Sequence, residues 1–277
     1  MIPTIKLSDG NEFFYEHRNT DLYHTPLMGK HHYHRQFEIY YFIKGECKYF
    51  IDDRTYTLFP GDIILIPENV IHRTLYTADY ERMLLNFNDA FIPDSVKDKL
   101  DSMLYLYRNP NLSKEIKHIF ESIGAEYAAL DEHSEDMLMG LVRSLFILLA
   151  RNENKATQSG GNSAFVAKTV KIISESFQTD LTLNDLAESF SVSPEHLSRT
   201  FKKETGFGFN EYLTLVRLQK AEQFLEEGEL KTVSEIAYAC GFNDSNYFSD
   251  RFKKTHGISP LKFRQKHRKS IAKKKKL

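Results

Sequence analysis

Imidazole and carboxylate side chains gather in the first third of the chain. His32, His34 and Glu38 are spaced by even numbers of residues, and Tyr40 continues the series. On an extended strand even spacing places side chains on one face, so these groups are predicted to project together. With His72 they form a set that could hold a small hydroxylated ligand by hydrogen bonds.

Three interpretations of this set stay open. The one we favour is a pocket for an organic effector that requires no metal cofactor and is lined by His32, His34, Glu38, Tyr40 and His72. The second is a metal-containing pocket used for sensing, because the three histidines and Glu38 are also a ligand set for divalent metals. The third is a barrel whose polar residues are purely structural and which responds to another trigger.

Residues of the other parity beside this set are expected to lie elsewhere. Arg35 and Arg73 should point out of the pocket. A second apolar layer, either another sheet or a helical hairpin, is expected to cover Phe37, Ile39, Tyr41 and Ile43.

A helical pattern occurs twice in the last hundred residues. The copies are offset by 50 positions at Ala187 and Ala237, and by 51 at Phe201 and Phe252, so the second copy has one extra residue near its turn. Each copy is typical of a helix, a short turn and a second helix, the arrangement that places one helix in a DNA major groove.

The outward face of the second helix in the first copy has groups suited to DNA. Leu197 and Phe201 should face the core, and Arg199 could make a bidentate contact with guanine. Lys202 and Lys203 are placed to contact DNA phosphates. The predicted DNA contacts of this copy are Glu195, Ser198, Arg199, Lys202 and Lys203.

The corresponding helix of the second copy has fewer groups suited to contact with DNA. Asn246 could recognise adenine, whereas Asp250 places a carboxylate towards phosphate. We therefore expect the first copy to contribute more sequence recognition. The predicted contacts here are Ser245, Asn246, Ser249, Asp250 and Lys253. A helix over 210–226, about 25 Å long, should separate the two recognition helices by about 34 Å, one DNA turn.

Charge and composition agree with a division into two parts. Residues 164–277 contain 20 Lys and Arg against 14 Asp and Glu, while residues 1–163 contain 17 against 24. A basic half can release counterions from phosphates and an acidic half cannot. The two cysteines exclude a disulfide framework, and no apolar run is long enough for a membrane span, so we expect a cytoplasmic protein without membrane contact.

The pattern of elements predicts an α+β chain of two domains. Short strands with turns between them indicate a small β-barrel over about 1–90, and helical periodicity indicates a hairpin over about 112–151. We assign the barrel and the hairpin to one domain, 1–151, which would hold the effector pocket, and the apolar stripes of its hairpin could pack in the core or on a second subunit. A flexible linker is expected at 152–163, an all-α double helix-turn-helix domain at 164–268, and a basic tail at 269–277.

Two motif sets resemble known families. The segments Ser193-x3-Leu197-x-Arg199-x-Phe201-Lys202-Lys203-x2-Gly206, Tyr212-x4-Arg217-x3-Ala221 and Ile236-Ala237-x3-Gly241-Phe242 closely resemble the AraC/XylS family of bacterial transcription regulators. His32-x-His34-x3-Glu38-x6-Gly45 and Gly61-x5-Pro67-x4-His72 resemble the two cupin motifs, and a cupin barrel is the usual N-terminal domain of that family. The resemblance implies double-stranded DNA and a small molecule as partners, dimerisation through the hairpin, and often action with RNA polymerase.

The function that we predict is a sequence-specific regulator of transcription, an activator or a repressor, that responds to a small effector such as a sugar and has no catalytic residues. One alternative is a metal-dependent cupin enzyme joined to a DNA-binding module. Another is a ligand-independent DNA-binding homodimer.

Overall fold

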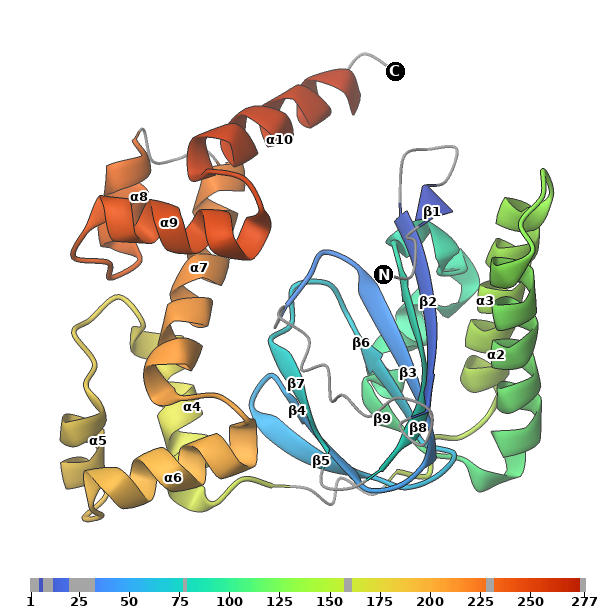
Figure 1. The fold of residues 1–277 in the computed structure, drawn as a ribbon, viewed down its shortest axis with the longest axis horizontal. Helices are drawn as coiled ribbons and strands as arrows, with labels where there is room; N and C mark the ends of the chain where they lie inside the picture. The colour runs from blue at the N-terminus through green and yellow to red at the C-terminus, as the bar shows by residue number, and fades with distance from the viewer. Residues whose placement is uncertain are drawn as a thin grey trace. The chain divides into compact units, whose positions relative to one another are not determined.

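The computed structural model describes residues 5–6, 12–19, 33–76, 79–156, 161–227 and 232–274, with the backbone alone for 5–6 and 268–274. The chain divides into two compact units, Met1–Gly161 and Asn162–Leu277. Figure 1 shows that strands and two long helices form the first unit, and that the described part of the second is helical. The predicted α+β fold class is confirmed.

Antiparallel strands form two sheets in the first unit. The larger sheet has the order β1 (Ile5–Lys6), β2 (Glu12–Asn19), β8 (Glu81–Phe87), β3 (Phe37–Lys44), β6 (Ile63–Ile66) and β9 (Tyr105–Tyr107). The smaller sheet has the order β5 (Arg54–Leu58), β4 (Cys47–Ile51) and β7 (His72–Tyr76). The sheet region extends beyond the predicted boundary near residue 90, because β9 pairs with β6 after a run of short helical turns.

Those turns and the hairpin make up the rest of this unit. The short helices are η1 (Asp89–Phe91), η2 (Asp94–Lys99), α1 (Leu100–Met103) and η3 (Pro110–Leu112). The predicted hairpin is present as α2 (Ser113–Ala128) and α3 (Ser134–Arg151). In Figure 1 these two helices lie along one face of the larger sheet.

Strand β3 contributes alternate residues to two hydrophobic cores. Phe37, Ile39 and Tyr41 pack in the core that contains the buried residues of α2 and α3. Tyr40 and Phe42, which have the other parity, pack with residues of β4 and β6. The helical hairpin is therefore the second apolar layer that the alternation predicts.

The segment after α3 differs from the prediction of a flexible linker from residue 152. Asn154 Oδ1 accepts hydrogen bonds from the amides of Arg108 at 3.0 Å and Ala156 at 2.9 Å, and its Nδ2 donates to the Leu106 carbonyl at 2.9 Å. The Lys155 amide donates to the Arg108 carbonyl at 2.8 Å. Residues 152–156 are thus part of the first unit, because their polar groups are satisfied by β9 and its flanks. Residues 157–160 lie outside the described ranges.

Seven helices make up the described part of the second unit. They are α4 (Ala164–Ser176), α5 (Leu183–Ser189), α6 (Pro194–Thr205), α7 (Phe209–Glu227), α8 (Val233–Ala239), α9 (Ser245–His256) and α10 (Pro260–Lys274). Helix α10 includes residues 269–274, which the sequence analysis assigned to a tail. Residues 275–277 lie outside the description.

The two helix-turn-helix copies have the same local construction. Thr182 and Thr232 cap the first helices, Ser193 and Asp244 cap the second helices, and left-handed glycines end them at 206 and 257. The turns are the place where the copies differ. Four residues separate α5 from α6 and five separate α8 from α9. The extra residue is Asn243, because the amides of Val192 and Phe242 make equivalent bonds to Ala187 and Ala237.

Gly241 offers a test of the packing at the second turn. It has a φ of +81°, and a Cβ there would lie 2.8 Å from the Phe177 carbonyl oxygen and 2.9 Å from that of Gln178. Gly257 has a φ of +74° but open space around it, so it is a matched control. We expect Gly257→Ala to lower the free energy of unfolding by about 1–2 kcal/mol through backbone strain alone. Gly241→Ala should lower it further, because backbone must also move. Urea denaturation followed by helical circular dichroism measures both, and equal losses would contradict the predicted contact.

Candidate functional site

The second helix of the first copy presents the predicted DNA contacts to solvent. Leu197 and Phe201 are fully buried, and Ser193 caps the helix by accepting a hydrogen bond from the His196 amide at 3.1 Å. The exposed side chains, which lie away from this buried stripe, include Glu195, Ser198, Arg199, Lys202 and Lys203. All five residues are therefore free to meet a DNA groove.

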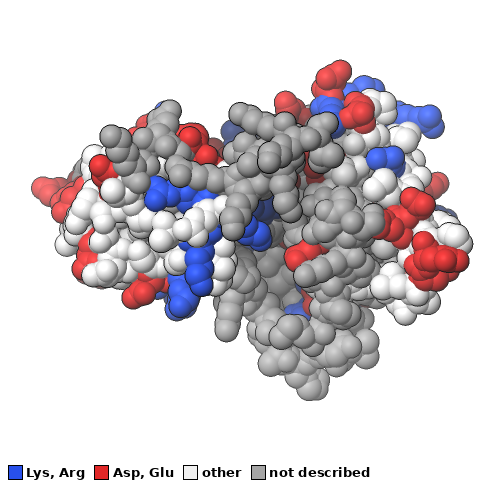
Figure 2. Space-filling model, turned by 90° about the horizontal axis from the view of Figure 1, so that it is seen from above, with Lys and Arg blue, Asp and Glu red and all other residues white. Residues whose placement is uncertain are grey.

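The corresponding face of α9 is less basic. Phe248 and Phe252 are buried, and Asn246, Asp250 and Lys253 are exposed as predicted. Ser245 and Ser249 are only half-exposed, because both lie at the edge of the buried stripe. Asp250 occupies the position equivalent to Arg199, since the two helices are aligned by an offset of 51 from cap to cap. Figure 2 shows Lys and Arg side chains gathered on one face of the second unit, with acidic groups near its edge.

Two exposed residues of α9 escaped the sequence analysis. Arg251 Nε donates a hydrogen bond to the Tyr247 hydroxyl at 3.0 Å, and its guanidinium lies 5.1 Å from the centre of that ring. Their i, i+4 spacing was the available signal, because such pairs meet on a helix surface. They place an aromatic and a cationic group beside the predicted contacts.

Arg217 of α7 links the segment after α4 to the second helix-turn-helix copy. Its Nε donates to the Phe177 carbonyl at 2.8 Å and its Nη2 donates to the Thr179 carbonyl at 2.8 Å. Its guanidinium also lies 5.9 Å from the ring of Phe242, in the second turn. One side chain therefore ties the end of α4 to the turn before α9. The predicted separation of about 34 Å between the recognition helices stays a prediction.

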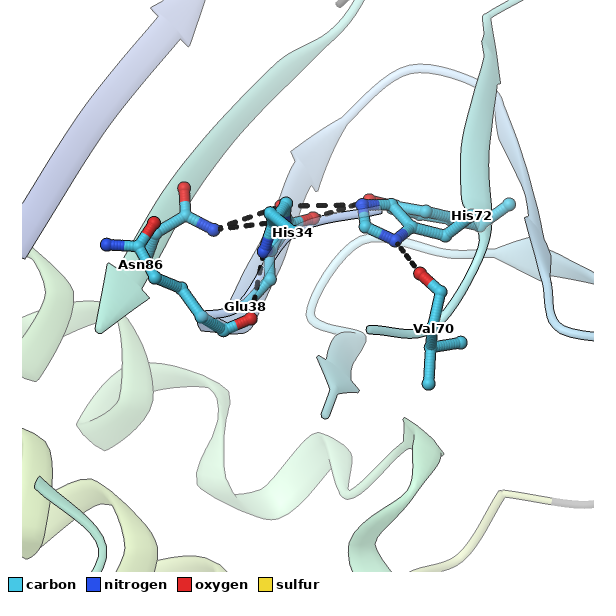
Figure 3. Close-up of polar contacts among 7 residues, drawn as sticks. His34, Glu38, Val70, His72 and Asn86 are labelled. Atoms are coloured by element: carbon cyan, nitrogen blue, oxygen red, sulfur yellow. Dashed lines mark hydrogen bonds and ion pairs between the residues drawn. The ribbon is translucent and has the colours of Figure 1, made fainter. Parts of the chain in front are cut away.

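In the first unit, three of the predicted polar residues converge. Ligand atoms of His34, Glu38 and His72 lie within 4.8 Å of one another. Figure 3 shows these three side chains together with Asn86 and Val70. Glu38 Oε2 lies 3.2 Å from His34 Nε2 and 3.7 Å from His72 Nε2. Glu38 and His72 are buried, and His34 is partly exposed. We refer to these three residues as the polar cluster.

Two further residues complete the surroundings of Glu38. The Tyr49 hydroxyl donates to Glu38 Oε1 at 2.5 Å, and Asn86 Nδ2 donates to Glu38 Oε2 at 3.3 Å. Neither residue is predictable from the spacing around Glu38, because they come from β4 and β8. The strand register explains Asn86, which is the direct cross-strand partner of Glu38.

Hydrogen bonds to the backbone orient both imidazoles. His34 Nδ1 donates to the Gln36 carbonyl at 2.9 Å, and His72 Nδ1 donates to the Val70 carbonyl at 2.8 Å. With Nδ1 protonated, a neutral ring directs the lone pair of its Nε2 towards a carboxylate oxygen. That arrangement is favourable only with a proton or another cation between them.

The charges of the cluster shift the pKa values in the directions expected of a pair. Burial alone would raise the pKa of Glu38, but the two histidines hold it well below its ordinary value. Burial alone would lower the pKa of His72, but the Glu38 carboxylate raises it above 6.5.

The other two residues predicted for this pocket are not part of the cluster. Tyr40 is fully buried, and its hydroxyl lies 3.2 Å from that of Tyr76 and 3.9 Å from the Cys47 sulfur. Tyr40 therefore belongs to the packed interior rather than to the His34 group. His32 lies outside the described residues. Arg35 is exposed and Arg73 half-exposed.

Comparison with known proteins identifies the same two parts. A model of the AraC-like ligand binding domain matches residues 18–153, and a helix-turn-helix domain model matches residues 186–266. The chain belongs to the AraC family of transcriptional regulators. The AraC-family assignment confirms the resemblance drawn from the motifs.

Relatives of this AraC-family chain span most of its length. It is 27% identical over 234 residues to the Msm operon regulatory protein of Streptococcus mutans. This match covers 82% of this chain and 83% of the relative. It is 26% identical over 245 residues to the transcriptional activator RhaS of Klebsiella pneumoniae, covering 84% and 87%. The C-terminal domain of AraT, a response regulator from Geobacillus stearothermophilus, is 40% identical, with a TM-score of 0.36, and the match covers 38% of this chain and 86% of that domain.

These assignments give the AraC-family chain a DNA-binding unit and a ligand-binding unit. Within the described ranges, no helix combines the length and the apolar character that crossing a bilayer requires.

The difference between α6 and α9 predicts unequal effects on DNA binding. Arg199→Ala should weaken binding to a specific site by about 1–3 kcal/mol, roughly 5- to 150-fold in Kd, because a base contact is lost. Asp250→Asn should strengthen binding, because a carboxylate leaves the phosphate-facing surface. Lys171→Ala, an exposed charge paired with Glu175 on α4, is the control. Electrophoretic mobility shifts at fixed ionic strength measure all three. The ranking of the two copies is wrong if Arg199→Ala has no effect while Asn246→Ala abolishes binding.

The polar cluster predicts a window of pH for its contribution to stability. The lowered pKa of Glu38 means that its contribution is present above 4.5 and lost as the pH falls through the folded-state pKa. The raised pKa of His72 means that its contribution is present below 6.5 and lost as the pH rises through the folded-state pKa. Glu38→Gln should therefore lower Tm most between these two values, and the loss should shrink at higher pH. Thermal melts with a chelator present measure this, with the exposed Glu115→Gln as control. A loss that does not vary with pH would rule out the pairing.

Proposed function

We propose that this protein regulates transcription by gripping two successive major-groove segments with α6 and α9, under control of a small molecule bound by its first unit. The observation that supports this most strongly is the second unit itself. It presents two recognition helices of the same length with equivalent caps, joined through one central helix. The protein is proposed to act in the cytoplasm and to have no catalytic activity.

The effector is proposed to be a small hydroxylated compound of the sugar class, held at the polar cluster. Its hydroxyls would replace the weak contacts there, since Glu38 Oε2 lies 3.2 to 3.7 Å from the side-chain nitrogens of His34, His72 and Asn86. Carboxylate, imidazole and amide groups together both donate and accept, as a sugar hydroxyl requires.

Two further partners complete the proposal. A second copy of the chain is expected to dimerise through the outer face of the hairpin, where the Met137 side chain is 53% exposed on α3. Dimerisation would place four recognition helices along the DNA. Contact with RNA polymerase at the promoter would then make the protein an activator.

Hydroxyl-radical footprinting on a selected binding site tests the DNA-binding mode. We expect each protomer to protect two groove segments about 10 base pairs apart, because each of its two recognition helices enters one major groove. Arg199→Ala should selectively weaken protection of one segment, and Asn246→Ala that of the other. A protomer that protects a single segment would overturn the proposed grip.

The second candidate for the first unit is a divalent metal site at the polar cluster. Both Nε2 atoms face one carboxylate oxygen while both Nδ1 atoms are held by carbonyls, which is the orientation of metal-binding histidines. The residues present thus fit a metal with two imidazoles and one carboxylate. There the metal would supply a positive charge for an oxygen-bearing ligand, and the chain's own groups would orient it.

Metal analysis decides between these candidates. If the metal proposal holds, protein dialysed against Zn²⁺, Mn²⁺ or Fe²⁺ should retain about one ion per chain, because three ligands converge. His72→Ala and Glu38→Gln should lose it, while His118→Ala on the exposed face of α2 should retain it. Mass spectrometry of the dialysed proteins gives the stoichiometry. No retained metal, or retention by the His72→Ala protein, would count against the site.

A further inference from the structure

The first unit contains a cavity of about 460 Å³ whose wall includes the start of the connection to the DNA-binding unit. Its walls are α1 and β9, the end of α3, residues 152–154 and 156, and Tyr56 of β5. No member of the polar cluster lines it. The volume is within the range of small-molecule sites, about 300–1,000 Å³.

The lining of the cavity favours a neutral ligand rich in hydroxyls. The rings of Tyr56 and Tyr105 lie 6.3 Å apart, tilted at 58°, and both line the space. Within the described ranges their hydroxyls make no hydrogen bond, so they are available to a ligand. Burial raises the pKa of Tyr105 to about 12, which keeps its hydroxyl protonated as a donor.

Charge in the lining discriminates against anions. Among the described residues that line the cavity, the charged ones are Asp101 and Glu153, and none is Lys or Arg. A carboxylate or phosphate placed there would face like charge without a cationic partner. Two aromatic rings beside polar groups instead suit a sugar, whose faces are apolar and whose edge is polar.

The same walls anchor the connecting segment. Asn154 Nδ2 donates to the Leu106 carbonyl at 2.9 Å and to the Ser102 carbonyl at 3.4 Å, and all three residues line the cavity. The amides of Lys155 and Ala156 are held by Arg108 and by Asn154. Arg108 is itself fixed by two 2.6 Å bonds to the buried Asp62. A ligand in the cavity would therefore touch the groups that keep residues 152–156 in place.

We propose that this cavity is a second small-molecule site, which takes a neutral sugar-sized polyhydroxy compound and whose occupancy stabilises the docked form of residues 152–156. The inference rests on the proposed function, because it assumes a regulator whose DNA-binding unit responds to the first unit. A ligand that binds the docked segment better than the released one shifts the balance between them by that difference in affinity. Docking shortens the free connection between the units and so changes how the DNA-binding unit is presented.

The first experiment measures binding to the full chain by calorimetry. The probes are glucose, galactose, rhamnose, maltose and sucrose, with gluconate as the anionic counterpart of glucose. We expect at least one neutral sugar to bind, and the double variant Tyr56→Phe/Tyr105→Phe to weaken it about tenfold or more through loss of two hydroxyls. Glu38→Gln at the polar cluster should leave that affinity unchanged, and gluconate should not bind.

The second experiment tests whether ligand binding stabilises the docked form of residues 152–156. Hydrogen exchange at the Lys155 and Ala156 amides should slow when the sugar is bound. Asn154→Ala should weaken sugar binding, because the docked form that the sugar favours is lost, and at saturating sugar the affinity of this variant for DNA should no longer change. Leu130→Ala, an exposed side chain between α2 and α3 that does not line the cavity, is the control for folding.

The outcomes separate this inference from the proposed function. Sugar binding that is lost in Glu38→Gln and retained in the tyrosine double variant assigns the effector to the polar cluster and overturns the cavity site. Unaltered exchange at residues 155 and 156 in the saturated protein overturns the coupling. Two-segment DNA protection that persists in either case leaves the proposed DNA-binding function standing.

Discussion

The burial of α7 on nearly all sides is the constraint on which the DNA-binding unit depends. Its buried residues include Phe209, Leu213, Val216, Leu218 and Leu225, which do not fall on a single stripe. A helix that is apolar around its circumference must be enclosed by other elements. Helices from both copies pack around it, and α7 therefore cannot turn without disturbing both recognition helices.

Polar contacts of α7 restrict how the surrounding helices can pack against it. Arg217 connects the end of α4 with the second turn near the middle of the helix. Glu222, near the end of α7, is 4% exposed. Its Oε2 lies 3.0 Å from Nε2 of His256, the last residue of α9. Buried polar groups need partners with a defined geometry, so they specify one arrangement where apolar packing alone would allow several. These contacts fix the positions of the two helix-turn-helix copies around α7.

Strand β3 has a comparable role in the first unit. One of its faces is committed to the hairpin, while the other runs from Glu38 in the polar cluster to Tyr40 and Phe42 in the packed interior. A shift of register by one residue would exchange these faces. The position of the polar cluster is therefore coupled to the packing of α2 and α3, the helices proposed to meet a second subunit.

Local patterns in the sequence determined most helices of the second unit, the cap at Ser193 and the extra residue in its second turn, because these depend on contacts a few residues apart. Alternation likewise determined the two faces of β3. His34 lies before this strand, which begins at Phe37, so its approach to Glu38 depends on the bend at residues 35 and 36 and not on strand alternation. Tertiary structure decided what depends on distant partners. Tyr40 shares the parity of Glu38 but bonds to Tyr76, Asn86 reaches Glu38 through a strand register, and Asn154 joins a polar segment to β9 although its composition is that of a linker. Composition and hydrophobic periodicity depend on residues that are near one another in the sequence. Contacts between strands depend on which strands become neighbours, and only the folded structure determines this.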